Sequence, residues 1–286
     1  MTLKDAGRVT LIRAARTRIL EQMLFHPLTR LTGFVKRQHA WDANKSTVSM
    51  EDALKKIPDF IVRHGPFRGL RYPIARACGS SLFPKLLGSY ERELHPILES
   101  ILTKSYQRIV DIGCAEGYYA IGLARRLPGV RVFAYDSNAE ALELCRQMAK
   151  LNSVTDRIVF GSFCSKDELT RIGSGGRCLV LSDCEGYELN LFNRDVCRAL
   201  AKHDVLIEVH DFRNPSISQN LLDAFEETHE VDVIRSIADE RRPDIYRYPE
   251  LKGFSGDDRA ALLAELRPAD MEWFYFHSRV AESPSC

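Results

Sequence analysis

Residues 109–123 read Ile-Val-Asp-Ile-Gly-Cys-Ala-Glu-Gly-Tyr-Tyr-Ala-Ile-Gly-Leu, and they decide the fold. A short apolar strand ends here in a turn that carries Gly113 and Gly117, and a helical pattern of apolar residues follows. Glycine has no Cβ, so the backbone turns sharply and a ligand lies close against it. The helix N-terminus offers unpaired N–H groups to that ligand. The run predicts a strand–turn–helix unit that binds a small molecule, with Asp111 at the end of the strand.

The glycine spacing and a second acidic residue narrow the ligand. The pattern is Asp-x-Gly-x-x-x-Gly, whereas dinucleotide-binding proteins carry Gly-x-Gly-x-x-Gly, which suits a pyrophosphate. The wider spacing favours a ligand that ends in an amino acid, and it disfavours an NAD-dependent oxidoreductase. The next predicted strand, residues 130–135, ends in Asp136, which is placed to accept hydrogen bonds from a ribose diol. The alternative interpretation is a turn whose glycines serve packing alone.

These two motifs resemble those of the class I S-adenosylmethionine-dependent methyltransferases. The resemblance is carried by Val-Asp-Ile-Gly-Cys-Ala-Glu-Gly at 110–117 and by Ala-Tyr-Asp at 134–136. It implies that Asp111 and the turn glycines hold the methionine part of the cofactor and that Asp136 holds its ribose. Phe163 is placed to pack on the adenine. The full set of cofactor-binding candidates is Asp111, Gly113, Cys114, Glu116, Gly117, Tyr118, Asp136, Ser137, Ser162, Phe163 and Asp183.

Residues further along the chain resemble the FkbM-like branch of that class. Leu-Val-Leu-Ser-Asp-Cys-Glu-Gly-Tyr-Glu at 179–188 resembles the branch's Ile-Asp-x-Glu-Gly-x-Glu motif. Val-Leu-Ile-Glu-Val-His at 205–210 resembles the strand that follows it, which also ends in glutamate. Leu181 stands where members usually carry a lysine, so any substrate-binding role of that lysine is not carried over. The resemblance covers residues 105–280.

The pattern of the remaining chain predicts the fold class. From residue 106 onward apolar strands alternate with helical patterns, which indicates a parallel sheet covered on both faces. We expect an α/β fold, a Rossmann-like doubly wound, mostly parallel seven-stranded sheet with an N-terminal helical and lid extension. The expected strands are 107–112, 130–135, 157–160, 178–182, 204–209, 231–237 and 272–277. The expected helices are 89–103, bent near Pro96, and 118–127, 139–151, 166–172, 188–201 and 216–229.

Three domains are predicted along the chain. Residues 1–56 form a basic N-terminal helical segment and linker, and residues 57–104 form a lid or cap. Residues 105–286 form an S-adenosylmethionine-binding methyltransferase domain. The candidate lid residues are Phe67, Tyr72 and Tyr90, for which aromatic packing is the commoner role.

Charge and composition limit the partners. The formal net charge of +1 argues against a strongly electrostatic nucleic-acid binder, so no nucleic acid is expected. Residues 1–40 nevertheless carry eight basic and two acidic residues. Within them, residues 8–25 form a predicted basic amphipathic helix that suits peripheral membrane contact. A helix packed on the domain, with solvated arginines, is the simpler alternative.

The cysteines and the hydropathy pattern predict a location. The chain has eight cysteines, but it has no Cys-x-x-Cys pair and no histidine pair that would complete a zinc pattern. We expect free thiols in a reducing compartment. The sequence shows neither a bilayer-length apolar run nor the apolar stretch of a signal peptide. The expected location is the cytoplasm.

The predicted catalytic groups lie where parallel strands end. Ligands of an open α/β sheet bind at the carboxyl ends of its strands, and Asp183, Glu208 and His210 follow two neighbouring strands there. Methyl transfer needs an aligned nucleophile and, for a hydroxyl, a base. His210 titrates near neutrality in its ordinary state, so it is the first candidate base, ahead of the two acids.

A metal-assisted mechanism is the alternative to simple base catalysis. The predicted ligands are Asp183, Glu208 and Asp211, whose oxygens suit Mg²⁺ or Mn²⁺. Acids at strand ends also cap helices, which weakens this hypothesis. The substrate-binding candidates are Glu185, Tyr90 and Arg242. Glu188, in the first turn of a predicted helix, is equally well explained by the helix dipole.

Two functions of different kinds follow. The first is S-adenosylmethionine-dependent O-methylation of a small-molecule or sugar hydroxyl, with a small-molecule or glycan acceptor as the partner and His210 or an acidic residue as the base. The alternative is a non-catalytic module that keeps the cofactor pocket and recruits a partner or membrane surface through its basic N-terminus.

Overall fold

The computed structural model describes residues 50–280 of the 286-residue chain. All of them belong to the compact unit formed by residues 45–286. The predicted amphipathic helix at 8–25, nearly all of the linker at 38–50 and Cys286 lie outside the described residues. Within the described part of the chain, no helix is long and apolar enough to cross a membrane.

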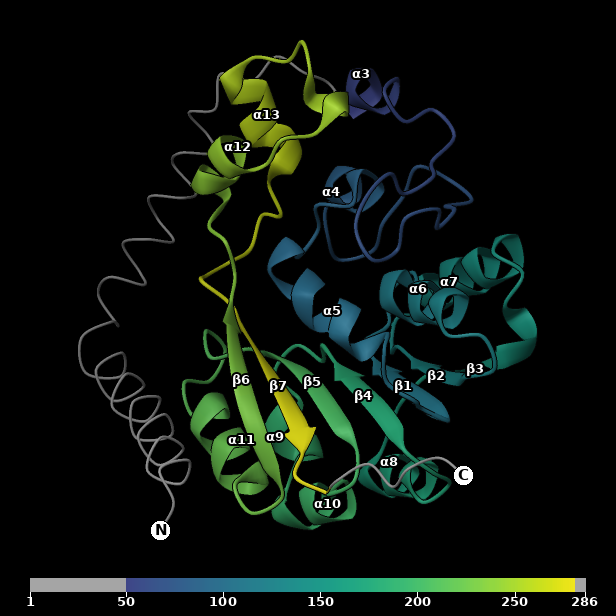
Figure 1. Cartoon of the computed structure of the whole chain (residues 1–286), viewed down its shortest axis with the longest axis vertical. Helices are drawn as coiled ribbons and strands as arrows, with labels where there is room; N and C mark the ends of the chain where they lie inside the picture. The colour runs from purple at the N-terminus through teal and green to yellow at the C-terminus, as the bar shows by residue number, and fades with distance from the viewer. Residues whose placement is uncertain (1–49, 281–286) are drawn as a thin grey trace. The chain divides into compact units, whose positions relative to one another are not determined.

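A seven-stranded mixed sheet forms the centre of the described unit (Figure 1). The strand order is β3-β2-β1-β4-β5-β7-β6, in which β1 to β5 are parallel and β7 runs antiparallel to both β5 and β6. The strands are β1 (Arg108–Ile112), β2 (Arg131–Tyr135), β3 (Ile158–Gly161), β4 (Cys178–Ser182), β5 (Asp204–Val209), β6 (His229–Arg235) and β7 (Glu272–Ser278). The predicted Rossmann-like, mostly parallel seven-stranded fold is confirmed.

Helices cover both faces of this sheet, and each face has its own core. Ile109 of β1 belongs to a core cluster that includes residues of α6 (Tyr118–Arg126) and α7 (Ala139–Leu151). Its neighbour Val110 belongs to the cluster on the other face of the sheet. This alternation follows from the two-residue period of a strand. The helices between the strands are α6, α7, α8 (Lys166–Gly173), α9 (Glu188–Leu191), α10 (Arg194–Ala199) and α11 (Ile217–Phe225).

Two predicted helices are wrong in detail. The single helix expected at 188–201 is two helices, because Asn193 leaves the helical conformation and its side chain accepts a hydrogen bond from the Val196 N–H, capping α10. The bent helix expected at 89–103 is a 3-10 turn η1 (Arg92–Leu94) followed by α5 (His95–Ile101). Pro96 stands in the first turn of α5, where its missing N–H costs nothing, so it starts the helix instead of bending it.

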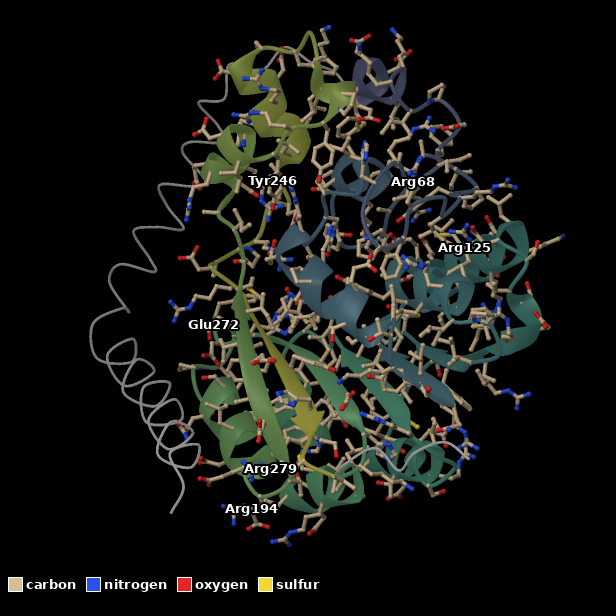
Figure 2. All side chains as sticks on the ribbon, viewed as in Figure 1. Arg68, Arg125, Arg194, Tyr246, Glu272 and Arg279 are labelled. Carbon is tan, nitrogen blue, oxygen red and sulfur yellow. The ribbon has the colours of Figure 1, made fainter. Side chains whose placement is uncertain are left out.

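Two segments outside the alternating strands and helices extend above the carboxyl ends of the parallel strands β1 to β5 in Figure 1. The first precedes β1 and contains α3 (Met50–Leu54), α4 (Leu82–Leu87), η1 and α5. The second, residues 236–271, separates β6 from β7. We call it the excursion. It contains η3 (Asp239–Arg241), α12 (Arg242–Ile245), η4 (Pro249–Leu251) and α13 (Gly256–Leu263), with Tyr246 directly after α12 as Figure 2 labels it.

Candidate active site

The glycine turn after β1 lies against the end of β4. Gly113 has φ of 85°, and a Cβ on it would stand 1.7 Å from the Asp183 carbonyl oxygen, so only glycine fits. Asp111, at the end of β1, is buried. Burial, and next the nearby Asp183 carboxylate, raise the pKa of Asp111 to about 7. No hydrogen bond reaches the buried Oδ2 of Asp111 from residues 50–280, so this oxygen suits a donor on a ligand.

Asp136 closes the other side of this turn. It follows β2, and its Oδ2 accepts the Ala115 N–H at 2.8 Å while its Oδ1 accepts the Asn138 N–H at 2.8 Å. The residue is half-buried, and Ser137 beside it is exposed. Each carboxylate oxygen has a second lone pair, so Asp136 can still accept from a diol. The structure therefore places Asp136 beside the glycine turn, as a ribose-binding acid requires.

Glu116 has a different environment from the one expected of a cofactor ligand. It is fully buried, and its carboxylate accepts hydrogen bonds from Lys85 Nζ at 2.5 Å, Cys78 N at 3.0 Å and Tyr72 OH at 3.1 Å. All three partners belong to the segment before β1. Glu116 therefore fastens that segment to the glycine turn, and Tyr72, a candidate lid residue, is one of the fastening groups.

The aromatic candidates divide into a buried and an exposed set. Tyr118 is buried between the edges of Phe67, at a ring distance of 5.1 Å, and Tyr90, at 5.5 Å. Tyr118 and Phe67 are buried, so packing accounts for these two rings, whereas Tyr90 is half-buried and its role in substrate binding stays a prediction. Phe163, by contrast, is 58% exposed and lies 5.5 Å from the ring of Tyr187. Of the other candidates near the turn and β3, Cys114 is buried and Ser162 is exposed.

His210, directly after β5, is the centre of an acidic cluster. It is 2% exposed, and its Nδ1 lies 2.7 Å from Oε1 of the fully buried Glu188. Its Nε2 faces three more carboxylates, at 3.4 Å from Asp183 Oδ1, 3.7 Å from Glu208 Oε2 and 3.9 Å from Glu185 Oε2. The structure therefore brings the three predicted catalytic residues together. It adds Glu188, for which the sequence left a helix-dipole role and a role in the site equally open.

The charges in this cluster determine which of its side chains are protonated. Burial alone would lower the pKa of His210, but the neighbouring Asp183 and Glu188 carboxylates outweigh it and raise the pKa to about 10. His210 is then an imidazolium at neutral pH, in which state it cannot accept a proton. Burial, and next Asp183, raise the pKa of Glu208 well above its ordinary value. Burial acts in the same direction on Asp183, but His210 lowers its pKa overall.

Arg267, whose side chain is only 13% exposed, joins the cluster to the excursion, and sequence reasoning missed it. Arg267 donates to Glu91 at 2.6 Å, to Glu265 at 3.0 Å and to Glu208 at closer range. These acids come from the segment before β1, the excursion and β5. Because the partners are up to 176 residues apart in the chain, no local pattern signals the network.

The remaining substrate and metal candidates have other partners. Arg242 is fully buried and pairs with Glu265, so it does not form the open substrate-binding rim that was expected. Asp211 accepts the Ser218 N–H at 2.9 Å, in the first turn of α11. Glu185 is exposed and pairs with Arg213 at 2.5 Å. Ligand atoms of Asp183, Glu185 and His210 lie within 4.8 Å of one another, a set that differs from the predicted Asp183, Glu208 and Asp211.

Part of the chain is similar to known methyltransferases. Residues 95–172 match the family model described as methyltransferase small domain. A release factor glutamine methyltransferase of Dictyoglomus turgidum is 36% identical over 62 residues, which are 22% of each chain. The same enzyme of Chlorobaculum tepidum is 48% identical over 52 residues, 18% of each chain. The matched part thus spans about a fifth of the length of these relatives.

Solved structures of low sequence identity were also found. One is a precorrin 8W decarboxylase of Methanobacterium thermoautotrophicum, with 16% identity, a TM-score of 0.44 and coverage of 64% of this chain and 89% of that one. Another is the O-methyltransferase TomG of Streptomyces achromogenes, with 14% identity, a TM-score of 0.43 and coverage of 66% and 80%.

The strand order and the glycine turn between Asp111 and Asp136 form a Rossmann-like α/β fold, and residues 95–172 of this fold are similar to the methyltransferase small domain. These similarities support the S-adenosylmethionine-dependent methyltransferase class that the sequence resembles, and they lend no support to the FkbM-like branch. The matched family segment ends at residue 172, before β4, so it does not include the acidic cluster.

Proposed function

We propose that this protein transfers a methyl group from S-adenosylmethionine to a hydroxyl oxygen of a small-molecule or sugar acceptor. One observation carries the proposal. The Glu188–His210–Asp183 row lies at the end of β4, which touches the glycine turn at Gly113. The groups suited to bind the cofactor and those suited to transfer a proton therefore meet at the carboxyl ends of the parallel strands.

The residues around the turn fit the cofactor. The unpaired Oδ2 of Asp111 suits its ammonium group, and the half-buried Asp136 suits its ribose diol. The exposed ring of Phe163, beside Tyr187, offers a face to the adenine. When bound, the cofactor supplies a methyl group on a positively charged sulfur.

Asp183 is the group that takes the acceptor's proton in this proposal. Its side chain is 39% exposed, whereas those of His210 and Glu208 are covered, so Asp183 alone of the three can reach an entering acceptor. His210 lies 3.4 Å behind it and is fixed by Glu188, so it orients the carboxylate. Such proton transfer contributes about 10²–10⁴-fold to a rate.

The test is an activity screen with a matched variant. S-adenosylhomocysteine release is measured with a panel of sugar and phenol hydroxyl acceptors, and cofactor affinity is measured by calorimetry. Asp183→Asn should lower kcat at least about 100-fold and change the cofactor Kd less than about threefold. Glu227→Gln, on the exposed surface, is the control. Full turnover of Asp183→Asn would rule out this role.

A second acceptor class has specific support. The relatives are named release factor glutamine methyltransferases, which favours an amide nitrogen as the acceptor. Complete proteolytic digestion of the methylated product, which leaves side-chain amides intact, and detection of glutamine methylated on its side-chain nitrogen would identify this chemistry. Cofactor binding without turnover on either class would instead favour the non-catalytic module. The FkbM-like branch, the cytoplasmic location and membrane contact through residues 8–25 remain predictions.

A further inference from the structure

We propose that Asp183, Glu185 and His210 bind one divalent transition-metal ion, with Glu188 as the residue that orients His210. The catalytic use of this ion rests on the proposed methyl transfer, because the ion would hold the acceptor oxygen beside Asp183. Binding of the ion is a separate property, and it can be measured without turnover.

The distances in the cluster fit a shared ion better than direct hydrogen bonds. His210 Nε2 lies 3.4 Å from Asp183 Oδ1 and 3.9 Å from Glu185 Oε2, whereas N–H···O bonds are about 2.7–3.2 Å long. Two atoms that each lie about 2.1 Å from one ion are about 3.0 Å apart at a right angle and about 3.4 Å apart at a tetrahedral angle. The ligand atoms of all three residues lie within 4.8 Å of one another, so the exposed Glu185 has to move inward by up to about an ångström to share the ion.

Two further observations point to a ligand at this place. The Oδ1 atom of Asp183 is buried, and no hydrogen bond to it is present among residues 50–280, although it faces His210 Nε2. Behind the ring, the fully buried Glu188 accepts from His210 Nδ1 at 2.7 Å. A carboxylate on one ring nitrogen is the usual way in which proteins hold the other nitrogen toward a metal.

The donor set selects the kind of ion. One imidazole nitrogen and two carboxylate oxygens suit Mn²⁺ or Zn²⁺ better than Mg²⁺ or Ca²⁺, which prefer oxygen alone. Three protein ligands leave positions open for water or an acceptor oxygen. Glu208 is outside this set because Arg267 holds its carboxylate.

Metal binding must displace two cations, the Nε2 proton of His210 and the guanidinium of Arg213. The Arg213 Nη2 lies 2.5 Å from Glu185 Oε2, the same oxygen that faces His210. Both side chains are more than half exposed, so Arg213 can move into solvent. Removal of Arg213 should therefore strengthen metal binding, whereas removal of the Glu185 charge should weaken it. If Glu185 and Arg213 formed only a surface ion pair, neither substitution would change the affinity for metal.

The experiment is a titration of the full chain with Mn²⁺, followed by electron paramagnetic resonance, and a competition with Zn²⁺. We expect one Mn²⁺ per chain, displaced by Zn²⁺ and not by equimolar Mg²⁺. Glu185→Gln should weaken binding at least about tenfold, and Glu188→Gln about 10–100-fold. Arg213→Met should strengthen binding severalfold. The exposed pair of Glu227 and Arg198 supplies matched controls, Glu227→Gln and Arg198→Met, which should change nothing.

The outcomes separate this inference from the proposed function. Absence of specific Mn²⁺ and Zn²⁺ binding, or unchanged affinity in Glu185→Gln with an intact circular-dichroism spectrum, overturns the metal site. Methyl transfer that persists at full rate in excess chelator overturns the ion's catalytic use and leaves the proposed function standing. Specific binding without turnover on any acceptor supports the site and counts against the proposed function.

Discussion

At the scale of the residue, Asp111 makes cofactor binding depend on pH. Burial raises the pKa of Asp111 to about 7, and the ionised form is the one that binds an ammonium group. The ionised fraction therefore grows between pH 6 and 7.5, while the α-amino group of the cofactor stays mostly protonated below about pH 7.7. Affinity should rise about fivefold over this interval, because ionisation of Asp111 raises it about eightfold and partial deprotonation of the amino group removes about a third of that gain. Calorimetry at several pH values checks this, and Asp111→Asn should be weaker and nearly independent of pH. A wild-type affinity that falls with rising pH would contradict the assignment.

Single residues were predictable where the backbone itself demands them. Gly113 was identified from spacing alone, and the structure gives the reason, since a Cβ there would strike the Asp183 carbonyl. The role of His210 was less predictable. Its ordinary pKa favoured a base, but four carboxylates that gather around it only in the fold hold its proton.

At the scale of the element, Arg267 couples the excursion to the site. Its side chain is 13% exposed and lies between Glu91, Glu208 and Glu265. Its loss removes the cation paired with the buried Glu91, whereas Glu265 keeps Arg242 and Glu208 keeps His210 nearby. Arg267→Met should lower the free energy of unfolding by about 3–5 kcal/mol, as expected for a broken buried pair. Arg267→Lys should lower the free energy of unfolding by less, because lysine keeps the positive charge. Urea denaturation measures both.

The control for this prediction is an arginine in an exposed pair. Arg235 lies 3.0 Å from Glu272 at the start of β7, labelled in Figure 2. Because its side chain is 55% exposed, Arg235→Met should cost less than about 1 kcal/mol. Equal losses from Arg267→Met and Arg235→Met would show that the buried network does not hold the excursion in place.

Elements were predictable to the extent that their signals are local. The five parallel strands are runs of mainly apolar residues, and each expected strand lies within about one residue of its observed bounds. The break between α9 and α10 was missed because the apolar period continues through Phe192, whose buried ring still belongs to the core. In the excursion the sequence singles out only Arg242, as a substrate-binding candidate, because the partners of the excursion are distant in sequence.

At the scale of the whole molecule, ligand binding should stabilise the entire described unit. The proposed cofactor site joins the ends of β1, β2 and β4, which are adjacent interior strands of the sheet, so the site is lost when the sheet unfolds. At 100 times its Kd, a ligand of the native state adds about 2.7 kcal/mol. For a unit of this size that corresponds to a rise in Tm of about 5–10 °C.

S-adenosylhomocysteine is the ligand for this measurement, and Asp136→Asn is the variant that separates binding from folding. Asp136 is half-buried at the edge of the turn, so its substitution should leave the unliganded Tm within a few degrees of the wild-type value. The ligand-induced rise should then largely disappear, because the ribose loses its acceptor. The exposed Asp156, in the 3-10 turn η2 (Thr155–Arg157) before β3, gives the control variant Asp156→Asn, which should keep the full rise. Differential scanning calorimetry at fixed ligand concentration measures all three proteins. An undiminished rise in Asp136→Asn would place the nucleoside elsewhere, and the interpretation of both acidic motifs would then have to be abandoned.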